Sequence, residues 1–387
     1  MNREFTTVWL LAGINAIAMS AIPMMMLIGS IIGSRLAPDA QWATLPIAMM
    51  VIGTACGVVP AARGMEHLGR RTTFLLFVAF GAAACGLAGQ ALAQQSFILY
   101  CISATLLGVT NAALQQIRFA AMESVPLDKG PSAASIIMCA GIIAAFVGPE
   151  LALMGQQITA VDYQGSYWLA ACCFILAGLL LLFYVPTKPR KAAVKIPARS
   201  AGELLKNPTL VLAVASAASA FVVMSFVMTA TPISMHLHHG LSLVDTKWVI
   251  QSHIAAMYLP SLLTVWLFKA FNIRGLMIAG LVCYSLTIII GLIDASVMGF
   301  WGQLVMLGIG WNFLFVSGTA LLPTAYQEGE QFRAQALNDS VVFTTQAIAS
   351  LSAGWAISAV SWHSLLLLCL IPMCSMAALL CWHRQPI

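Results

Sequence analysis

The stretch TKPRKAAVKIPARSAGELLKN, residues 187–207, is the one long polar interval in a chain of 387 residues. Its basic residues are Lys188, Arg190, Lys191, Lys195, Arg199 and Lys206. On either side the sequence is almost continuously apolar, since 60% of all residues are hydrophobic and only 8% are charged. A water-soluble domain has roughly a quarter of its residues charged, so the outside of this chain must face lipid. The pattern predicts two membrane-embedded halves joined by a basic linker.

Each half divides at polar and turn residues into stretches long enough to cross a bilayer, which takes about 20 apolar residues. The first half gives expected helices at 7–34, 43–63, 72–93, 97–121, 133–158 and 165–186. The second half gives expected helices at 208–235, 248–268, 275–293, 298–325, 335–360 and 364–382. We therefore predict an all-α membrane protein of twelve transmembrane helices, with an N-terminal bundle (1–186), a cytoplasmic linker (187–207) and a C-terminal bundle (208–387).

The basic residues predict the orientation in the cytoplasmic membrane. With both termini in the cytoplasm, sixteen of the eighteen Lys and Arg residues lie on the cytoplasmic side, and only Arg35 and Lys247 lie outside. Such a bias is the rule for short loops of membrane proteins. The net charge of +5 thus reflects topology, and no nucleic-acid partner is expected. All ten cysteines lie in apolar stretches, so we expect no disulfide, no bound metal and no cofactor.

The two halves repeat three short patterns in the same order. Helix 1 contains AIPMMM (21–26) and helix 7 contains ATPISM (230–235); helix 4 contains Leu107-Gly108-Val109 and helix 10 contains Leu307-Gly308-Ile309. After helix 2 comes EHLGRR (66–71), and after helix 8 comes the degenerate KAFNIRG (269–275). The repeats indicate a duplicated six-helix unit, an architecture that rocks around a site near the middle of the membrane.

Residues 62–71, ARGMEHLGRR, resemble the signature that the major facilitator superfamily carries between helices 2 and 3, Gly-x-x-x-Asp-Arg-x-Gly-Arg-Arg. This chain has Ala62 and His67 where the signature has its first glycine and first arginine, and Glu66 where it has aspartate. With the six-plus-six layout, the resemblance covers essentially the whole chain. It implies a conformational latch, in which the acidic residue pairs with neighbouring helix ends, formed by Glu66, Gly69, Arg70 and Arg71. The alternative is a solvated turn with cytoplasmic arginines.

Two further stretches are similar to parts of that superfamily. Gly141, Gly148 and Pro149 in helix 5 resemble its antiporter motif and imply a close-packed, pliable hinge, which slightly favours export. The match is partial, because Ala152-Leu153 replaces a Gly-Gly pair. Residues 308–315, GIGWNFLF, and 334–339, AQALND, look like a bacterial branch that includes vitamin transporters of the riboflavin type, which favours import.

Ionisable residues inside the membrane are functional candidates, because a charge in hydrocarbon is costly unless it is paired or hydrated. Glu150 follows the helix-weakening Pro149 and is our candidate for proton coupling; the alternative is a structural carboxylate paired with a helix or a substrate amine. Arg118 binds an anionic group or a carboxylate such as Glu123 or Asp339, or else it extends to the cytoplasmic surface. Asp339 is expected to cap the start of helix 11.

Several neutral polar residues lie near the expected depth of a substrate cavity, and most should face the bundle interior. They are Asn15, Asn111, Gln115, Gln251, His253, Asn312 and Gln346. For the substrate path we select Asn15, Asn111, Gln115, Arg118, Trp311 and Asn312. Trp311, Phe313 and Tyr258 either stack on a flat ligand or serve in ordinary packing. His236, His238 and His239 fit a hydrated turn outside helix 7 better than a metal site with Asp245.

These features predict a secondary transporter, not an enzyme, that moves a small organic solute across a bacterial inner membrane by alternating access. The chain has no Walker-type phosphate loop, so ATP is not expected to be its energy source. We expect it to be driven by the proton gradient and to be monomeric. Export is slightly favoured; the alternative is import of a riboflavin-type vitamin, a siderophore or a metabolite. A membrane-embedded enzyme would gather metal or nucleophile residues on one face, and a transporter-like sensor would append a soluble module. No catalytic residue is expected.

Overall fold

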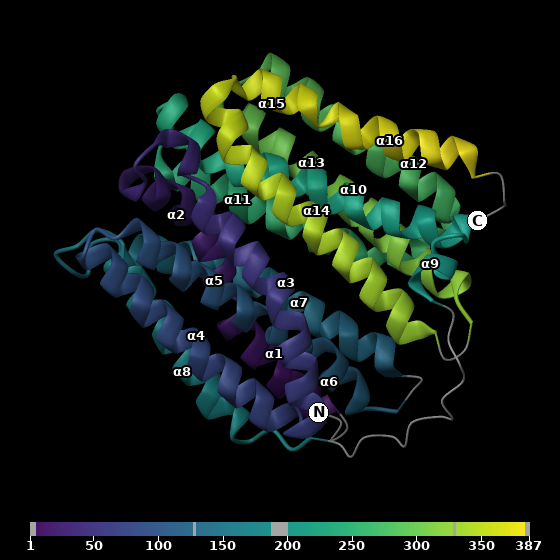
Figure 1. Ribbon diagram of the computed structural model, residues 1–387, viewed down its shortest axis with the longest axis horizontal. Helices are drawn as coiled ribbons and strands as arrows, with labels where there is room; N and C mark the ends of the chain where they lie inside the picture. Colours follow the sequence, from purple (N-terminus) through teal and green to yellow (C-terminus); the bar gives the residue numbers. More distant parts are fainter. Residues whose placement is uncertain (1–4, 127–128, 187–199, 328–329, 384–387) are drawn as a thin grey trace. The chain divides into compact units, whose positions relative to one another are not determined.

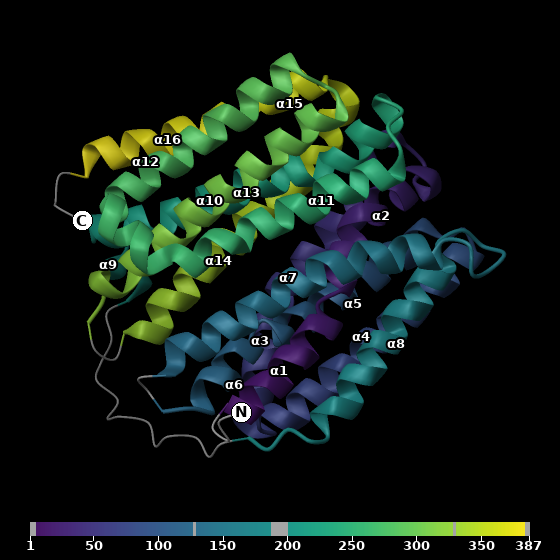
Figure 2. The same ribbon diagram turned by 180° about the vertical axis from the view of Figure 1, so that it is seen from behind.

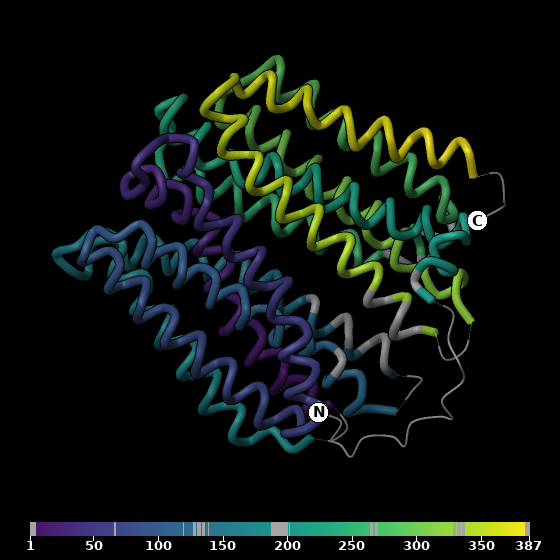
Figure 3. Tube along the Cα trace, in the orientation of Figure 1, coloured from purple at the N-terminus to yellow at the C-terminus, as the bar shows by residue number. Residues whose placement is uncertain are grey.

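The computed structural model describes residues 5–126, 129–186, 200–327 and 330–383. In these ranges every regular element is a helix. The chain divides into two compact units, Met1–Pro189 and Arg190–Ile387. Their helices are labelled in Figures 1 and 2, and Figure 3 traces the chain from purple at the N-terminus to yellow at the C-terminus. The boundary falls in the expected basic linker, of which residues 187–199 lie outside the described part. The rest of that linker contains the single helical turn α9 (Ala201–Leu204).

The N-terminal unit is built from long helices that mostly coincide with the expected ones. They are α1 (Thr6–Ala18), α2 (Ala21–Leu36), η2 (Ala40–Trp42), α3 (Leu45–His67), α4 (Arg70–Ala93), α5 (Phe97–Leu114), α6 (Ile117–Glu123), α7 (Gly130–Gly155) and α8 (Gln164–Leu181). The first expected helix is broken between α1 and α2, because Pro23 has no amide hydrogen to continue the ladder. The Ser20 hydroxyl donates to the Ala16 carbonyl oxygen at 2.7 Å beside this break.

Small residues bring the helices of this unit into backbone contact. A Cβ on Gly53 of α3 would overlap the carbonyl oxygen of Thr105, and a Cβ on Gly108 of α5 would overlap that of Met50. Close approach at small residues is how membrane helices gain packing energy where the hydrophobic effect offers none. The two glycines therefore fix how α3 and α5 cross.

The C-terminal unit repeats this plan with different interruptions. Its helices are α10 (Pro208–Pro232), the π-helix η4 (Ile233–His238), α11 (Leu243–Tyr258), η5 (Leu259–Leu263), α12 (Thr264–Ile293), α13 (Val297–Leu321), η6 (Leu322–Ala325), α14 (Gln331–Ala359), α15 (Trp362–Leu368) and α16 (Leu370–Trp382). Within α12 the chain turns at Asn272, whose φ of 50° is not helical. A Cβ on Gly308 of α13 would lie 2.6 Å from the His253 carbonyl oxygen, so this glycine repeats the role of Gly108.

The turns after the second helix of each unit match residue by residue. Gly69 and Asn272 both have positive φ, 80° and 50°. Two positions later, Arg71 donates to the carbonyl oxygen of Leu182 and Arg274 donates to that of Leu380, each at 2.5 Å. Glycine and asparagine are the residues that adopt this backbone conformation most readily. The degenerate repeat thus keeps the turn and the second arginine.

The described part of the chain contains ten helices long and apolar enough to span a membrane, and one shorter apolar helix, Cys139–Gly155. The latter belongs to α7, where we expected a helix at 133–158. The expected helix at 248–268 runs through α11 and η5 into the first residues of α12. The fold is that of an all-α membrane protein, and the count of twelve crossings stays a prediction.

Three expected details were wrong. The helix expected at 97–121 stops at Leu114 and resumes as α6, so Arg118 lies on a separate short helix. Asp339 cannot cap helix 11, because α14 begins at Gln331 and its N-cap is Glu330. His236 and His238 lie in the π-helix η4, which extends α10, and not in a hydrated turn after it.

Candidate functional site

The candidate residues of the N-terminal unit lie in three places, and the first is the turn after α3. Arg70 holds Glu123 through two hydrogen bonds, from Nε to Oε2 at 2.8 Å and from Nη2 to Oε1 at 2.5 Å. This bidentate ion pair, the geometry that arginine favours with a carboxylate, connects the start of α4 to the end of α6. The Glu66 side chain lies outside the described part, and of the residues expected to form the latch, Arg70 pairs with Glu123.

The second place is the contact between α7 and the break in the first helix. A Cβ on Gly148 would overlap the carbonyl oxygen of Ser20 and lie 2.9 Å from the Met24 nitrogen. Pro149 is buried next to it, and Glu150, one residue further on, is half-buried. Gly141 is half-buried in the same helix. The expected hinge of helix 5 therefore rests directly on the point where helix 1 changes course.

The third place is α5 with its neighbours. Asn111 donates from Nδ2 to the Thr54 hydroxyl of α3 at 3.3 Å, and its buried Oδ1 has no hydrogen-bond partner among the described residues. Asn15 of α1 is also buried, with 7% of its surface exposed. Gln115 and Arg118 are exposed where α5 gives way to α6. Asn111 thus joins α5 to α3 through its Nδ2 and keeps a buried acceptor, Oδ1, without a hydrogen-bond partner among the described residues.

In the C-terminal unit, Asn312 connects α13 to the end of α11. Its Nδ2 donates to the Met257 carbonyl oxygen at 2.7 Å and to the Ser261 hydroxyl at 2.5 Å. Pro260 stands between these two partners and interrupts the helix there. Only 1% of Asn312 is exposed. The contacts assign this side chain to holding an interrupted helix, which argues against its placement on the substrate path.

Trp311 is the centre of an aromatic cluster, which comprises Phe221, Tyr258, Trp311, Phe315 and Phe343. The indole stacks on the Phe315 ring with centroids 4.8 Å apart and planes 19° apart. Phe221 meets it edge-on at 5.2 Å, and Tyr258 does so at 6.3 Å. Phe343 contacts Phe221 at 6.2 Å. The rings come from α10, α11, α13 and α14, and the other four are half-buried while Trp311 is buried.

The indole of Trp311 carries an unsatisfied donor. Its Nε1 is buried and has no hydrogen-bond partner among the described residues. A buried donor left unpaired costs about 1–3 kcal/mol, so such groups call for an explanation. The aromatic cluster therefore contains a buried N–H donor whose hydrogen-bonding capacity is unused among the described residues.

Sequence reasoning gave no part to several residues that complete these arrangements. No sequence motif contains Ser20, Thr54, Phe221 or Phe343. They are identified only by their contacts in the folded chain: Ser20 with Gly148, Thr54 with Asn111, and Phe221 with Trp311 and Phe343. His253, expected near the depth of the substrate cavity, donates from Nδ1 to the Leu304 carbonyl oxygen at 2.8 Å, and its buried Nε2 has no partner in the described ranges. Among the described residues, no group of three or more His, Cys, Asp or Glu is arranged to hold a metal ion.

Comparison with known proteins decides the family. A sequence model of the Major Facilitator Superfamily matches residues 7–265. This chain belongs to the major facilitator superfamily. A relative in Brucella anthropi, the riboflavin transporter RfnT, is 34% identical over 353 residues, which are 90% of this chain and 88% of that protein. The uncharacterised superfamily transporter YdeG of Bacillus subtilis is 28% identical over 92% of this chain and 87% of its own length.

A solved structure of another superfamily member has the same fold. It is a bacterial homologue of the human lysosomal transporter Spinster, crystallised in an inward-facing and occupied conformation. It shares 15% sequence identity with this chain and has a TM-score of 0.72, covering 97% of this chain and 95% of its own. The protein is thus a multi-pass membrane transporter of the bacterial superfamily type, and the resemblance of residues 62–71 to the superfamily signature pointed to the right family.

Proposed function

We propose that this transporter carries riboflavin or a closely related flat heterocycle by alternating access. The observation that carries the proposal is the riboflavin transporter that is 34% identical to it over 90% of the chain. The similarity runs through both units, so it includes the helices that supply Asn111 and Trp311. The expected inner-membrane location with cytoplasmic termini belongs to the same proposal.

The aromatic cluster supports a flat, polar ligand. The isoalloxazine ring of riboflavin is planar, and aromatic side chains hold such rings by offset stacking or edge-to-face contacts. Its carbonyl oxygens are acceptors for a lone N–H donor, which Trp311 Nε1 supplies. A ligand that pairs with this donor removes a cost already present in the protein, so part of its affinity comes from that group.

Proton coupling is proposed for Glu150, which is half-buried next to the Gly148–Pro149 contact with the break of helix 1. A carboxyl group at this place is next to the backbone that would move in an alternating-access cycle. Loading it with a proton in one state and releasing it in the other would connect the proton gradient to solute movement.

Reconstituted liposomes test the transport proposal. Wild-type protein should give saturable riboflavin flux above that of protein-free liposomes, and lumiflavin should compete. Trp311→Phe keeps an aromatic ring but removes the N–H, so the Kd measured by quenching of riboflavin fluorescence should rise about five- to tenfold. Trp248→Phe is the matched control, because Trp248 is 58% exposed. Absence of flux and of any ligand-induced rise in melting temperature would refute the proposed substrate.

Export of planar drug-like compounds is the second candidate, favoured by the resemblance of Gly148 and Pro149 to the antiporter motif. The same liposomes measure it, with ethidium as the planar probe and a proton gradient of either sign. Net riboflavin flux under the two gradients also gives the direction of transport. Gradient-driven ethidium movement without riboflavin flux would replace the first proposal by the second.

A further inference from the structure

The N-terminal unit has a further candidate binding place, formed by residues other than those of the arrangements described above. A cleft of about 410 Å³ lies between the end of α2, the end of α4 and the loop before α8. The walls that matter here are Arg35, Gln95, Asp162 and Tyr163, with Ile32, Leu36 and Leu92 as apolar neighbours. Its volume is within the range of small-molecule sites, about 300–1,000 Å³.

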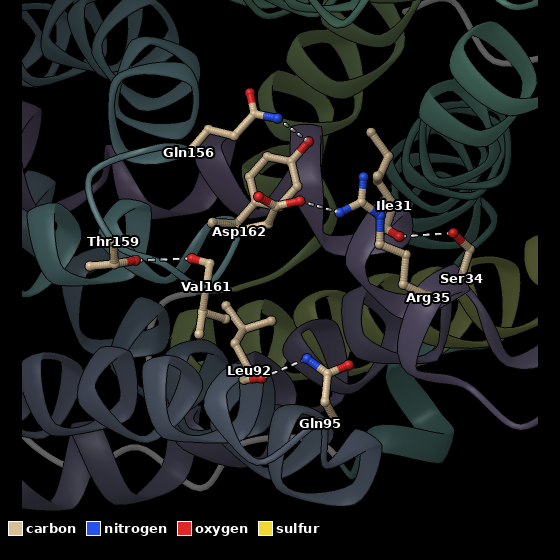
Figure 4. A network of polar contacts seen from close by, with 10 residues as sticks. Ile31, Ser34, Arg35, Leu92, Gln95, Gln156, Thr159, Val161 and Asp162 are labelled. Carbon is tan, nitrogen blue, oxygen red and sulfur yellow. Dashed lines mark hydrogen bonds and ion pairs between the residues drawn. The ribbon is translucent and has the colours of Figure 1, made fainter.

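An ion pair defines the polar part of this cleft. Arg35 Nη1 lies 3.1 Å from Asp162 Oδ2, and the two side chains are 49% and 65% exposed. In Figure 4 the Asp162 carboxylate points at the Arg35 guanidinium, and Gln95 lies on the α4 side. The remaining guanidinium N–H groups and Asp162 Oδ1 have no further partner among the described residues. The cleft therefore presents unused donors beside an unused acceptor.

The surroundings hold this pair in position. The Arg35 guanidinium lies over the Tyr163 ring, 5.5 Å from its centroid. Gln156 donates to the Tyr163 hydroxyl at 3.2 Å. Burial raises the pKa of the Tyr163 phenol, while nearby Arg35 opposes the shift, so the ring is neutral at pH 7. Gln95 donates from Nε2 to the Leu92 carbonyl oxygen at 2.9 Å, which leaves its Oε1 as a further acceptor.

Adjacent opposite charges select a neutral ligand. An anion drawn to Arg35 is repelled by Asp162, and a cation drawn to Asp162 is repelled by Arg35. A neutral ring edge with a carbonyl beside an N–H satisfies both, since the carbonyl accepts from the guanidinium and the N–H donates to the carboxylate. The apolar side chains of Ile32, Leu36 and Leu92 suit the faces of such a ring.

We infer that this cleft is a recognition subsite for planar heterocycles with an imide or lactam edge, the edge that the isoalloxazine of riboflavin carries at N3 and C4. The inference rests on the proposed function and deepens it. By the expected orientation the cleft lies on the outer face, where Arg35 is one of two basic residues. A solute on that side reaches this cleft before it enters the membrane region.

A ligand-and-variant cycle tests the subsite. Binding of lumiflavin and of 3-methyl-lumiflavin, which lacks the N–H, is measured by flavin fluorescence on purified full-length protein. In wild type, methylation should weaken binding about five- to tenfold. Asp162→Leu should bring that factor close to one, whereas Asp162→Asn should keep most of it, because the amide oxygen still accepts. Asp39→Asn, an exposed carboxylate between α2 and η2, should behave as wild type.

The two Asp162 variants separate recognition from stability. Both lose the ion pair with Arg35, so a purely structural role lowers their melting temperatures alike and leaves the methylation factor unchanged in both. That unchanged factor would overturn the subsite, even if lumiflavin binding and riboflavin flux persist. Displacement of lumiflavin by phosphatidylethanolamine in wild type but not in Asp162→Leu would overturn it in favour of a lipid headgroup. Failure of wild type to bind lumiflavin overturns the proposed function as well.

Discussion

Arg71 and Arg274 make the same hydrogen bond in the two units of this transporter. Each follows a turn with positive φ and donates from its guanidinium to a carbonyl oxygen near the end of its unit's final helix, Leu182 or Leu380. Carbonyls at a helix C-terminus lack partners within the helix and attract cations. The pair shows that the weak repeat between residues 66–71 and 269–275 preserves an interaction as well as a sequence pattern.

Removing either arginine should therefore weaken its own unit. We expect Arg71→Ala and Arg274→Ala each to lower the free energy of unfolding by about 0.5–1.5 kcal/mol, because the carbonyl loses a charged donor. Both bonds are internal to one unit, so the double variant should show the sum of the two losses. Chemical denaturation in detergent micelles measures this. A loss for one variant and none for the other would contradict the equivalence.

The glycine contacts make a prediction about packing. Gly308→Ala places a methyl group 2.6 Å from the His253 carbonyl oxygen, which is backbone and cannot turn away. We expect a loss of about 1–3 kcal/mol, typical of overpacking. Gly302→Ala in the same helix is the control, because its Cβ meets nothing closer than 3.9 Å, and it should gain up to about 1 kcal/mol from helix propensity. Equal melting temperatures for the two variants would show that α11 and α13 do not pack as described.

The pairing of Arg70 with Glu123 predicts a charge-swap result. Their side chains are 21% and 51% exposed, so the pair should contribute only about 0.2–1 kcal/mol to stability. If the pair acts as a latch, its loss should change the transport rate more than the stability. Arg70→Glu should therefore slow riboflavin flux several-fold, and adding Glu123→Arg should restore part of the flux. Arg63→Glu, an exposed residue near the end of α3, should leave the flux unchanged. If the double variant transports more slowly than both single variants, the ion pair has no role in the transport cycle.

Proton coupling at Glu150 has a specific signature. Glu150→Gln keeps the size of the side chain but cannot release a proton, so accumulation of riboflavin driven by a pH gradient should be lost. Exchange of internal for external riboflavin needs no proton movement and should continue. Asp39→Asn serves again as the control carboxylate. Undiminished gradient-driven accumulation in Glu150→Gln would show that another group carries the proton.

The sequence was most informative where backbone geometry needs a particular residue. Gly69 and Asn272 stand in one pattern that the two halves repeat, and Gly108 and Gly308 stand in another; the structure places the first two at turns and the second two at close helix contacts. These features are local, so they can be read along the sequence. The resemblance of residues 62–71 to the superfamily signature, with the six-plus-six layout, pointed to the family.

Contacts between distant parts of the chain were not readable in the same way. Arg70 and Glu123 are 53 positions apart in the sequence, with all of α5 and nearly all of α4 and α6 between them. Many carboxylates could have been the partner of that arginine. The breaks after Ala18 and Leu114 and the position of Asp339 inside α14 were missed, because an apolar stretch looks the same whether it is straight or interrupted. The unpaired Nε1 of Trp311 depends on what surrounds it, which only the folded chain reveals.

The close contact between Gly148 and the Ser20 carbonyl oxygen also limits which substitutions α7 can accept. A side chain at position 148 would push α7 away from the bend in the first helix, and Glu150, about 3 Å further along the same helix axis, would be displaced with it. The position of the Glu150 carboxyl group along the helix axis therefore depends on the packing of Gly148. Natural variants of this chain should tolerate substitutions of the lipid-facing side chains of α7 far more readily than any substitution of Gly148.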